Sequence, residues 1–145
     1  MAGTLNIRIV VVDDDIAACQ ALRRTVFIEE QGVSEDLEID GLDDACTHVL
    51  ATRGGVPIAT ARIRLLDDVA KIQRVCVLPA HRGEGIGAAV MRFILTEVTT
   101  ASSVRVARLG AQIDALDFYR KLGFTPVGPE YMEAGIRHQD METAL

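Results

Sequence analysis

The chain has 145 residues, a length typical of one domain, and we expect residues 1–145 to form a single domain. Apolar residues make up 49% of the chain but aromatic residues only 4%, which predicts an aliphatic core and favours an α/β domain. The formal net charge of −6 argues against broad binding to nucleic acid or to an anionic membrane, because both require clustered Lys and Arg.

Neither a secretion signal nor an apolar run of about 18 residues is present, so we expect a cytoplasmic protein. The three cysteines, Cys19, Cys46 and Cys76, form no even set and no C-x-x-C pair, which indicates reduced structural thiols. No two His or Cys residues have the spacing of metal ligands on one element. We therefore expect no metal site.

The amino-terminal part predicts a strand over residues 5–12, because these residues are apolar and β-branched. Asp13 and the two aspartates after it can cap a helix that extends to about residue 30, before Gly32. Helical spacing places Gln20, Arg23 and Arg24 on the polar face of this helix.

An acidic segment over residues 34–47 follows, with the pattern Glu38-x-Asp40-x-x-Asp43, and lacks periodicity. We interpret it as a long ordered loop or lid. Its charge suggests a cationic acceptor such as a polyamine, an amino sugar or a lysine side chain. A solvated charge run that aids solubility is the alternative interpretation.

The rest of the chain alternates strand and helix patterns. The Gly54-Gly55 pair predicts a hairpin, and an Asp67-Asp68 turn continues the meander. The predicted strands are 48–53, 57–66, 70–78, 104–111, one that starts at 124–127 and a last one within 131–145; the predicted helices are 86–99 and 114–122.

The turn from Arg82 to Gly87 joins a predicted strand to a predicted helix, and its glycines allow the backbone to approach a ligand closely. Free amides at a helix N-terminus bind phosphate groups without much net positive charge. The turn is neither a P-loop, which ends in Gly-Lys-Ser or Gly-Lys-Thr, nor a dinucleotide fingerprint near a first strand. A glycine-rich turn that only closes the connection is the alternative.

Two segments resemble signatures of the GNAT superfamily of acetyltransferases. The run V-x-V-x-P-x-x-R-G-x-G-I-G, from Val75 to Gly87, resembles the acetyl-CoA-binding segment, and Ala115 to Phe124 resembles A-x-x-F-Y-x-K-x-G-F. The resemblance implies an α/β (α+β) GNAT fold: a mixed, mainly antiparallel sheet of six to seven strands, splayed after strand 4 and flanked by about four helices.

The resemblance also implies that acetyl-CoA is the donor cosubstrate. The backbone of residues 76–78 would pair with the pantetheine arm, the amides of the turn would hold the pyrophosphate, and Arg82 would flank it, with His81 near a phosphate. The implied cofactor-binding residues are Cys76, Val77, Leu78, Arg82, Gly83, Glu84, Gly85, Ile86, Gly87, Ala88 and Phe118.

By the same resemblance an amine attacks the thioester directly. A backbone amide near Val77 would stabilise the oxyanion, and Tyr119 matches the tyrosine that protonates the departing sulfur. Packing beside Phe118 and Phe124 is the alternative role of Tyr119. For the general base we favour Glu30, and the other chemically able residues are Glu29, Glu38, Asp40, His48, Glu133 and His138.

The run from Arg23 to Val33, the E-x-D-x-x-D pattern and the ending Glu133-Ala134-Gly135-Ile136-x-His138 look like the ElaA-type subgroup. The acceptor would be a small-molecule or peptide amine. GNAT proteins are often dimers, so the resemblance is compatible with a homodimer, but the sequence leaves the oligomeric state open. Acyl-homoserine-lactone synthases share the amino-terminal pattern and are the enzymatic alternative. A non-catalytic acyl-CoA-binding sensor is the alternative from another class.

Overall fold

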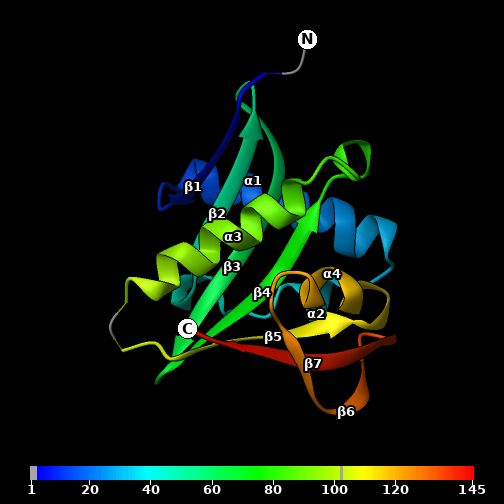
Figure 1. The fold of residues 1–145 in the computed structure, drawn as a ribbon. Helices are drawn as coiled ribbons and strands as arrows, with labels where there is room; N and C mark the ends of the chain where they lie inside the picture. The colour runs from blue at the N-terminus through cyan, green and yellow to red at the C-terminus, as the bar shows by residue number, and fades with distance from the viewer. Residues whose placement is uncertain (1–2, 102) are drawn as a thin grey trace.

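The computed structural model describes residues 3–101 and 103–145. They form one seven-stranded sheet in the order β1-β2-β3-β4-β5-β7-β6 (Figure 1). The strands are β1 (Leu5–Val10), β2 (Thr47–Arg53), β3 (Val56–Leu66), β4 (Val69–Val77), β5 (Val106–Gln112), β6 (Thr125–Glu133) and β7 (Ile136–Ala144). The longer helices are α1 (Asp13–Arg23), continued by a π-helical segment (Arg24–Glu30), and α3 (Ile86–Thr99); the shorter ones are α2 (Glu35–Glu38) and α4 (Leu116–Arg120).

The sheet is mainly antiparallel and splays after β4, as predicted. β4 pairs with β5 in parallel, and this pairing covers only Val69 to Lys71 against Val106 to Arg108. Beyond these three residue pairs the two strands diverge, so the carboxyl ends of β4 and β5 leave an opening between them. The predicted mixed α/β fold with four flanking helices is therefore confirmed.

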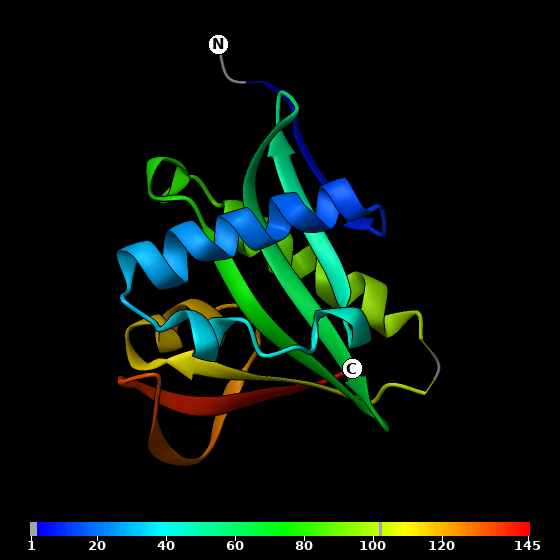
Figure 2. The same ribbon diagram turned by 180° about the vertical axis from the view of Figure 1, so that it is seen from behind.

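Helices cover both faces of the sheet. α3 packs on one face of β2, β3 and β4, and α1 packs on the other face of the same strands (Figures 1 and 2). α2 lies on the α1 side. The buried side chains of α3 that join the larger core cluster are Ile86, Val90, Met91, Ile94 and Val98. This spacing is the helical period that the sequence showed. No described helix is long and apolar enough to cross a membrane.

Two glycine positions fix local geometry. Gly54 and Gly55 have φ of 57° and 82° and form the tight turn between β2 and β3, as predicted. Gly85 precedes α3 with φ of 80°, a left-handed conformation that disfavours any residue with a Cβ.

Two expectations need correction. Segment 34–47 is not a continuous loop, because it contains α2 and a 3₁₀ turn at Asp43–Ala45. The polar face of the first helix is not exposed at Arg23, whose side chain is only 2% exposed. The predicted last strand within residues 131–145 is confirmed as β7, and Ala134 and Gly135 turn the chain between β6 and β7.

Candidate active site

Two adjoining cavities occupy the region where β4 and β5 diverge. One, of about 600 Å³, lies against the glycine-rich turn and is called the loop cavity. The other, of about 640 Å³, lies over β4 to β7 below α2 and is called the sheet cavity. Both are lined by Gln31, Val75, Ala115 and Tyr119, so the cavities meet at these residues.

The loop cavity contains most of the predicted cofactor-binding residues. Gly83 and Gly85 both have φ of 80°, and a Cβ added to either would meet no atom within 4 Å, so their backbone faces open space. The first backbone amides of α3, like those of any α-helix, have no acceptor within the helix and are available to a ligand. The predicted residues that line this cavity are Cys76, Val77, Arg82, Gly83, Gly85, Ile86, Gly87, Ala88 and Phe118, with His81.

Two predicted cofactor residues do not line the loop cavity. The Glu84 side chain forms an ion pair with Arg53. The Leu78 amide donates to the Ile58 carbonyl of β3 at 2.9 Å. Because backbone groups alternate in direction along a strand, the amide of Val77 points the opposite way, toward the opening between β4 and β5. Val77 is therefore the residue of 76–78 whose amide is free to meet a ligand.

Arg82 and Glu30, predicted in separate roles, bind each other. The two terminal nitrogens of Arg82 each lie 2.6 Å from a carboxylate oxygen of Glu30, and Arg82 Nε donates to the Val77 carbonyl at 3.0 Å. The hydrogen bond from Arg82 lowers the pKa of Glu30. A carboxylate with a lowered pKa is a weaker base, and Glu30 lines neither cavity, so the geometry argues against Glu30 as the base.

Tyr119 lies at the junction of the cavities, on α4. Its ring packs edge-on against Phe118 at 4.9 Å and Phe124 at 6.0 Å between centroids. Burial raises its pKa to about 12, so the phenol stays protonated at neutral pH. The aromatic packing and the access to both cavities are thus both present, and the packing fixes the direction of the hydroxyl.

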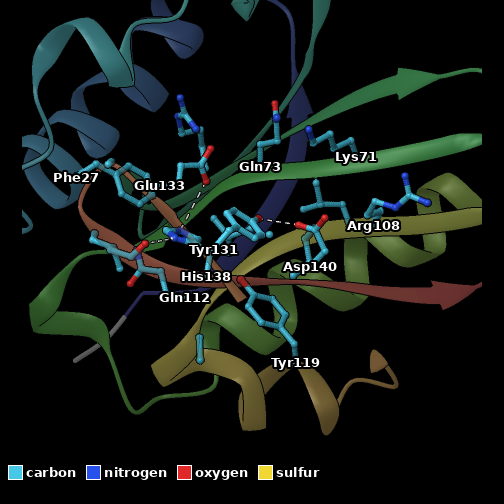
Figure 3. A pocket seen from close by; sticks show the side chains of 18 of the residues that line it. Phe27, Lys71, Gln73, Arg108, Gln112, Tyr119, Tyr131, Glu133, His138 and Asp140 are labelled. Carbon is cyan, nitrogen blue, oxygen red and sulfur yellow. Dashed lines mark hydrogen bonds and ion pairs between the residues drawn. The ribbon is translucent and has the colours of Figure 1, made fainter. Parts of the chain in front are cut away.

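The β6–β7 hairpin brings a polar group into the sheet cavity (Figure 3). His138 Nδ1 lies 2.7 Å from the Ile136 carbonyl and must donate to it, because a carbonyl only accepts. His138 Nε2 lies 3.8 Å from a carboxylate oxygen of Glu133. The His138 ring stacks on Tyr131, whose hydroxyl donates to Asp140 at 2.6 Å. A neutral His138 therefore carries its free electron pair on Nε2, within the cavity.

The acidic segment 34–47 is joined to buried arginines. Arg23 Nε donates to Glu38 at 2.6 Å and its terminal nitrogens donate to Asp43 at 3.0 and 2.8 Å. Arg62, 1% exposed, binds both Asp40 and Asp43. The pKa of Asp40 is lowered to about 2, chiefly by the hydrogen bond from Arg62. Burial opposes ionisation of Asp43, but hydrogen bonds from Arg23, Gln20 and Arg62 outweigh it and lower its pKa.

This ion-pair network corrects both interpretations for three residues of the acidic segment, whereas Glu35, Asp36 and Asp44 are exposed and lie outside it. Glu38, Asp40 and Asp43 are neither a solvated charge run nor free to attract a cationic acceptor, because arginine side chains already bind them. The network instead fastens α2 over the sheet cavity, which Leu37 and Glu38 help to line. It also argues against Asp40 as the general base, since Arg62 binds its carboxylate and a carboxylate with a pKa lowered to about 2 is a weak base.

Of the other candidate bases, only some line the cavities. His48 is 2% exposed and its Nε2 lies 2.9 Å from the Asp43 carbonyl, behind the network. Glu29 lines neither cavity, whereas Glu133 and His138 line the sheet cavity. Within residues 3–101 and 103–145, no group of three His, Cys, Asp or Glu side chains is placed to hold a metal ion.

Several residues of the sheet cavity were not predicted from the sequence as site residues. They are Lys71, Gln73, Arg74, Arg108, Gln112, Tyr131 and Asp140. Gln112 donates to Gln31 at 3.0 Å and links the end of β5 to the end of the first helix across the opening. These residues lie on strands that meet only through the sheet topology, and alternation along one strand could have marked at most which of them share a face.

The chain is similar in sequence and in fold to known proteins. The model of the acetyltransferase (GNAT) domain family matches residues 13–145. The chain belongs to the GNAT acetyltransferase family. The GNAT chain is 36% identical to the protein ElaA of Escherichia coli over 124 residues, which cover 83% of the chain and 81% of ElaA. The crystal structure of ElaA matches with a TM-score of 0.86 over 96% of the chain and 99% of ElaA.

Two further proteins are similar to this GNAT chain in sequence or in fold. It is 34% identical to the uncharacterized N-acetyltransferase YjcF of Bacillus subtilis over 121 residues, covering 83% of the chain and 86% of YjcF. A GNAT family acetyltransferase from Elizabethkingia anophelis, solved with acetyl-CoA bound, shares the fold with a TM-score of 0.76 at 18% identity over 97% of the chain and 98% of that protein. The ElaA-type assignment from the sequence motifs is thus confirmed.

Proposed function

We propose that this GNAT protein transfers an acetyl group from acetyl-CoA to a primary amine of its acceptor, by direct attack of the amine on the thioester. The observation that carries the proposal is the junction of the two cavities at Val75 and Tyr119. A donor in the loop cavity and an acceptor in the sheet cavity would present their reacting atoms to each other at this junction, which is the positioning that a bimolecular reaction needs.

The loop cavity suits the CoA part of the donor. The amides at Gly83 and Gly85 and at the start of α3 provide hydrogen-bond donors and the positive end of a helix dipole for a pyrophosphate. The free amide of Val77 faces the path of the pantetheine arm. The acetyl-CoA-bound Elizabethkingia anophelis protein of the same fold supports acetyl-CoA as the donor.

The chemical step places negative charge first on the thioester oxygen and then on the departing sulfur. The Val77 amide would stabilise the oxygen. The Tyr119 hydroxyl would donate a hydrogen bond to the sulfur. Full proton transfer from a phenol of pKa about 12 to a thiolate whose acid has a pKa near 8.5 is uphill by about 5 kcal/mol. Tyr119 therefore acts chiefly as a hydrogen-bond donor, and the thiolate can take its proton from water afterwards.

The attacking amine must lose a proton, and His138 is the base that the geometry favours. Its Nδ1–H is bound to the Ile136 carbonyl, so Nε2 is the proton acceptor. Glu133, 3.8 Å from Nε2, would stabilise the imidazolium that forms. In this proposal His138 replaces Glu30, whose carboxylate is bound to Arg82.

The first test is calorimetric titration of the full chain with acetyl-CoA and CoA, with NAD and ATP as controls. Selective binding of the CoA compounds is expected, and absence of any CoA binding would refute the proposal. An assay of thiol release with a set of amines then tests transfer. Binding without turnover of any amine would favour the acyl-CoA sensor, and turnover with long-chain donors alone would favour chemistry like that of acyl-homoserine-lactone synthases.

Two variants test the assigned roles. Tyr119→Phe should keep the affinity for acetyl-CoA and lower kcat about tenfold to hundredfold, at or below the usual range for acid–base catalysis, because only a hydrogen bond is lost. His138→Gln should lower kcat and keep the affinity for acetyl-CoA. Arg92→Met, an exposed change on α3, is the control. Equal loss of binding and rate in Tyr119→Phe would contradict its role.

A further inference from the structure

The sheet cavity is lined by charges of both signs. β4 contributes Lys71 and Arg74, and the β6–β7 hairpin contributes Glu133 and Asp140; Lys71, Glu133 and Asp140 are labelled in Figure 3. Asp67 and Asp68 line the cavity at the β3–β4 turn, and Glu38, which also lines it, is bound by Arg23. β5 lies between β4 and the hairpin, and its Arg108 is already paired with Glu142 at 3.0 Å. A ligand that carries one positive and one negative group matches a cavity lined by both signs of charge.

Arg74 is placed by an irregularity in β4. Between the pairs Arg62–Gln73 and Thr60–Cys76, two residues of β4 oppose one residue of β3, which defines a β-bulge. Arg74 is one of the two bulged residues, and its φ of 56° is unusual for a residue other than glycine. Bulges redirect side chains and are frequent beside functional sites. The other bulged residue is Val75, at the junction of the two cavities.

The charge of Arg74 is the least compensated in the ion-pair network. Its Nη2 lies 3.2 Å from the carbonyls of Leu37 and Glu38 and 3.4 Å from Asp40, whose carboxylate is bound more closely by Arg62. Carbonyl groups accept hydrogen bonds without neutralising a cation. Burial lowers the pKa of Arg74, and the positive charge of Arg62 lowers it further.

Arg74 also keeps an unused donor. Its Nε is buried and has no hydrogen-bond partner among the described residues. A guanidinium offers five N–H donors in a planar fork that matches a carboxylate. A carboxylate bound at this side chain would therefore supply the missing negative charge.

We propose that the acceptor is an amino acid, an amine that carries a carboxylate within a few bonds, with the carboxylate bound by Arg74 and the amine directed toward His138 and Glu133. This inference rests on the proposed acetyl transfer. Arg74 directly precedes the junction residue Val75 in the chain, so its Cα lies about 3.8 Å from that of Val75, and Arg74 lines the same cavity as His138 and Glu133. The short separation of the amine and the carboxylate in an amino acid allows both groups to lie within this one cavity.

A purely structural role is the competing explanation, since Arg74 also binds the carbonyls of Leu37 and Glu38 and so holds α2. The two explanations differ in one measurable respect. A structural defect lowers the rate for every acceptor alike, whereas a lost carboxylate contact lowers it only for acceptors that have a carboxylate.

The test is a comparison of matched acceptors at saturating acetyl-CoA. Leucine, phenylalanine and lysine are each compared with their carboxamides and with the amines that lack the carboxyl carbon, in wild type, Arg74→Met, Arg74→Lys and the exposed control Arg92→Met. For the preferred side chain, we expect removal of the carboxylate to lower kcat/KM about tenfold to hundredfold, the usual worth of a charged hydrogen bond. Arg74→Met should cost as much for the amino acid and little for the carboxamide.

Each outcome is decisive. If acetyl-CoA does not bind, the proposed function itself fails. If acetyl-CoA binds but carboxamides or simple amines react as well as the amino acids, the amino-acid assignment is wrong. If none of these acceptors reacts, the amino acids must still raise the Tm of the CoA-bound wild type, and must raise it less in Arg74→Met; no shift with any of them at millimolar concentration overturns the assignment.

Discussion

Replacement of Arg23 by Met should strongly destabilise the fold, because it breaks a buried ion pair and leaves one partner behind. Arg23 is 2% exposed and Glu38 3% exposed, and Arg23 is the cation bound to Glu38 at 2.6 Å. Asp43 keeps its bonds to Arg62 at 2.8 Å and Gln20 at 3.0 Å. The cost therefore arises mainly at Glu38, and removal of one partner from such a pair costs about 3–5 kcal/mol.

The double variant Arg23→Met, Glu38→Met separates loss of the pair from creation of an unpaired charge. With both charges gone and the volume filled by apolar groups, we expect the free energy of unfolding to recover by about 2–3 kcal/mol relative to Arg23→Met alone. The measurement is urea unfolding followed by circular dichroism, with Arg92→Met as a surface control. A single variant within about 1 kcal/mol of wild type, or a double variant no more stable than the single one, would refute the reasoning.

Three further predictions concern pH, the turn and Glu30. The folded-state pKa of Asp40 is about 2, below the ordinary value of 3.8. Ionised Asp40 therefore stabilises the fold above about pH 4, and this stabilisation is lost as the pH falls to 2. The free energy of unfolding of Asp40→Asn should change with pH by about 2 kcal/mol less than that of wild type in this window, and parallel curves would contradict this. Gly85→Ala should cost about 1–2 kcal/mol of stability, and so should the control Gly128→Ala, because both glycines have a positive φ. Only Gly85→Ala should weaken acetyl-CoA binding in calorimetry. Equal affinities of the two variants for acetyl-CoA would count against the turn as the pyrophosphate site. Glu30→Gln should keep kcat and raise acetyl-CoA affinity up to about fivefold by releasing Arg82 from an exposed pair, whereas a collapse of kcat with unchanged binding would restore Glu30 as the base.

The sequence was sufficient for the features that depend on local patterns. The apolar spacing from Ile86 to Val98 predicted the bounds of α3, since a helix with one buried face must repeat at this period. Gly54 and Gly55 predicted the hairpin because few other residues adopt their positive φ. The turn from Arg82 to Gly87 was recognised in the same way, from residues consecutive in the chain.

The acceptor side of the site was beyond local patterns. Arg23 fits the polar face of an amphipathic helix, and only the fold of segment 34–47 above it makes that face buried and ion-paired. Glu30 is a plausible base in sequence, but its ion pair with Arg82 spans 52 positions along the chain. Long-range electrostatic contacts of this kind leave no periodic signal.

The sequence by itself determined the family, the order of the elements and the glycine-rich turn, because each is encoded by neighbouring residues whose propensities and backbone angles are local. Only the tertiary structure decided which charges neutralise one another and which face a cavity. The splay of β4 from β5 brings Arg74, Tyr119 and His138 around one cavity, although they belong to separate elements of the chain. Their proximity follows from strand order and register, which the global packing of the sheet sets and no single segment specifies.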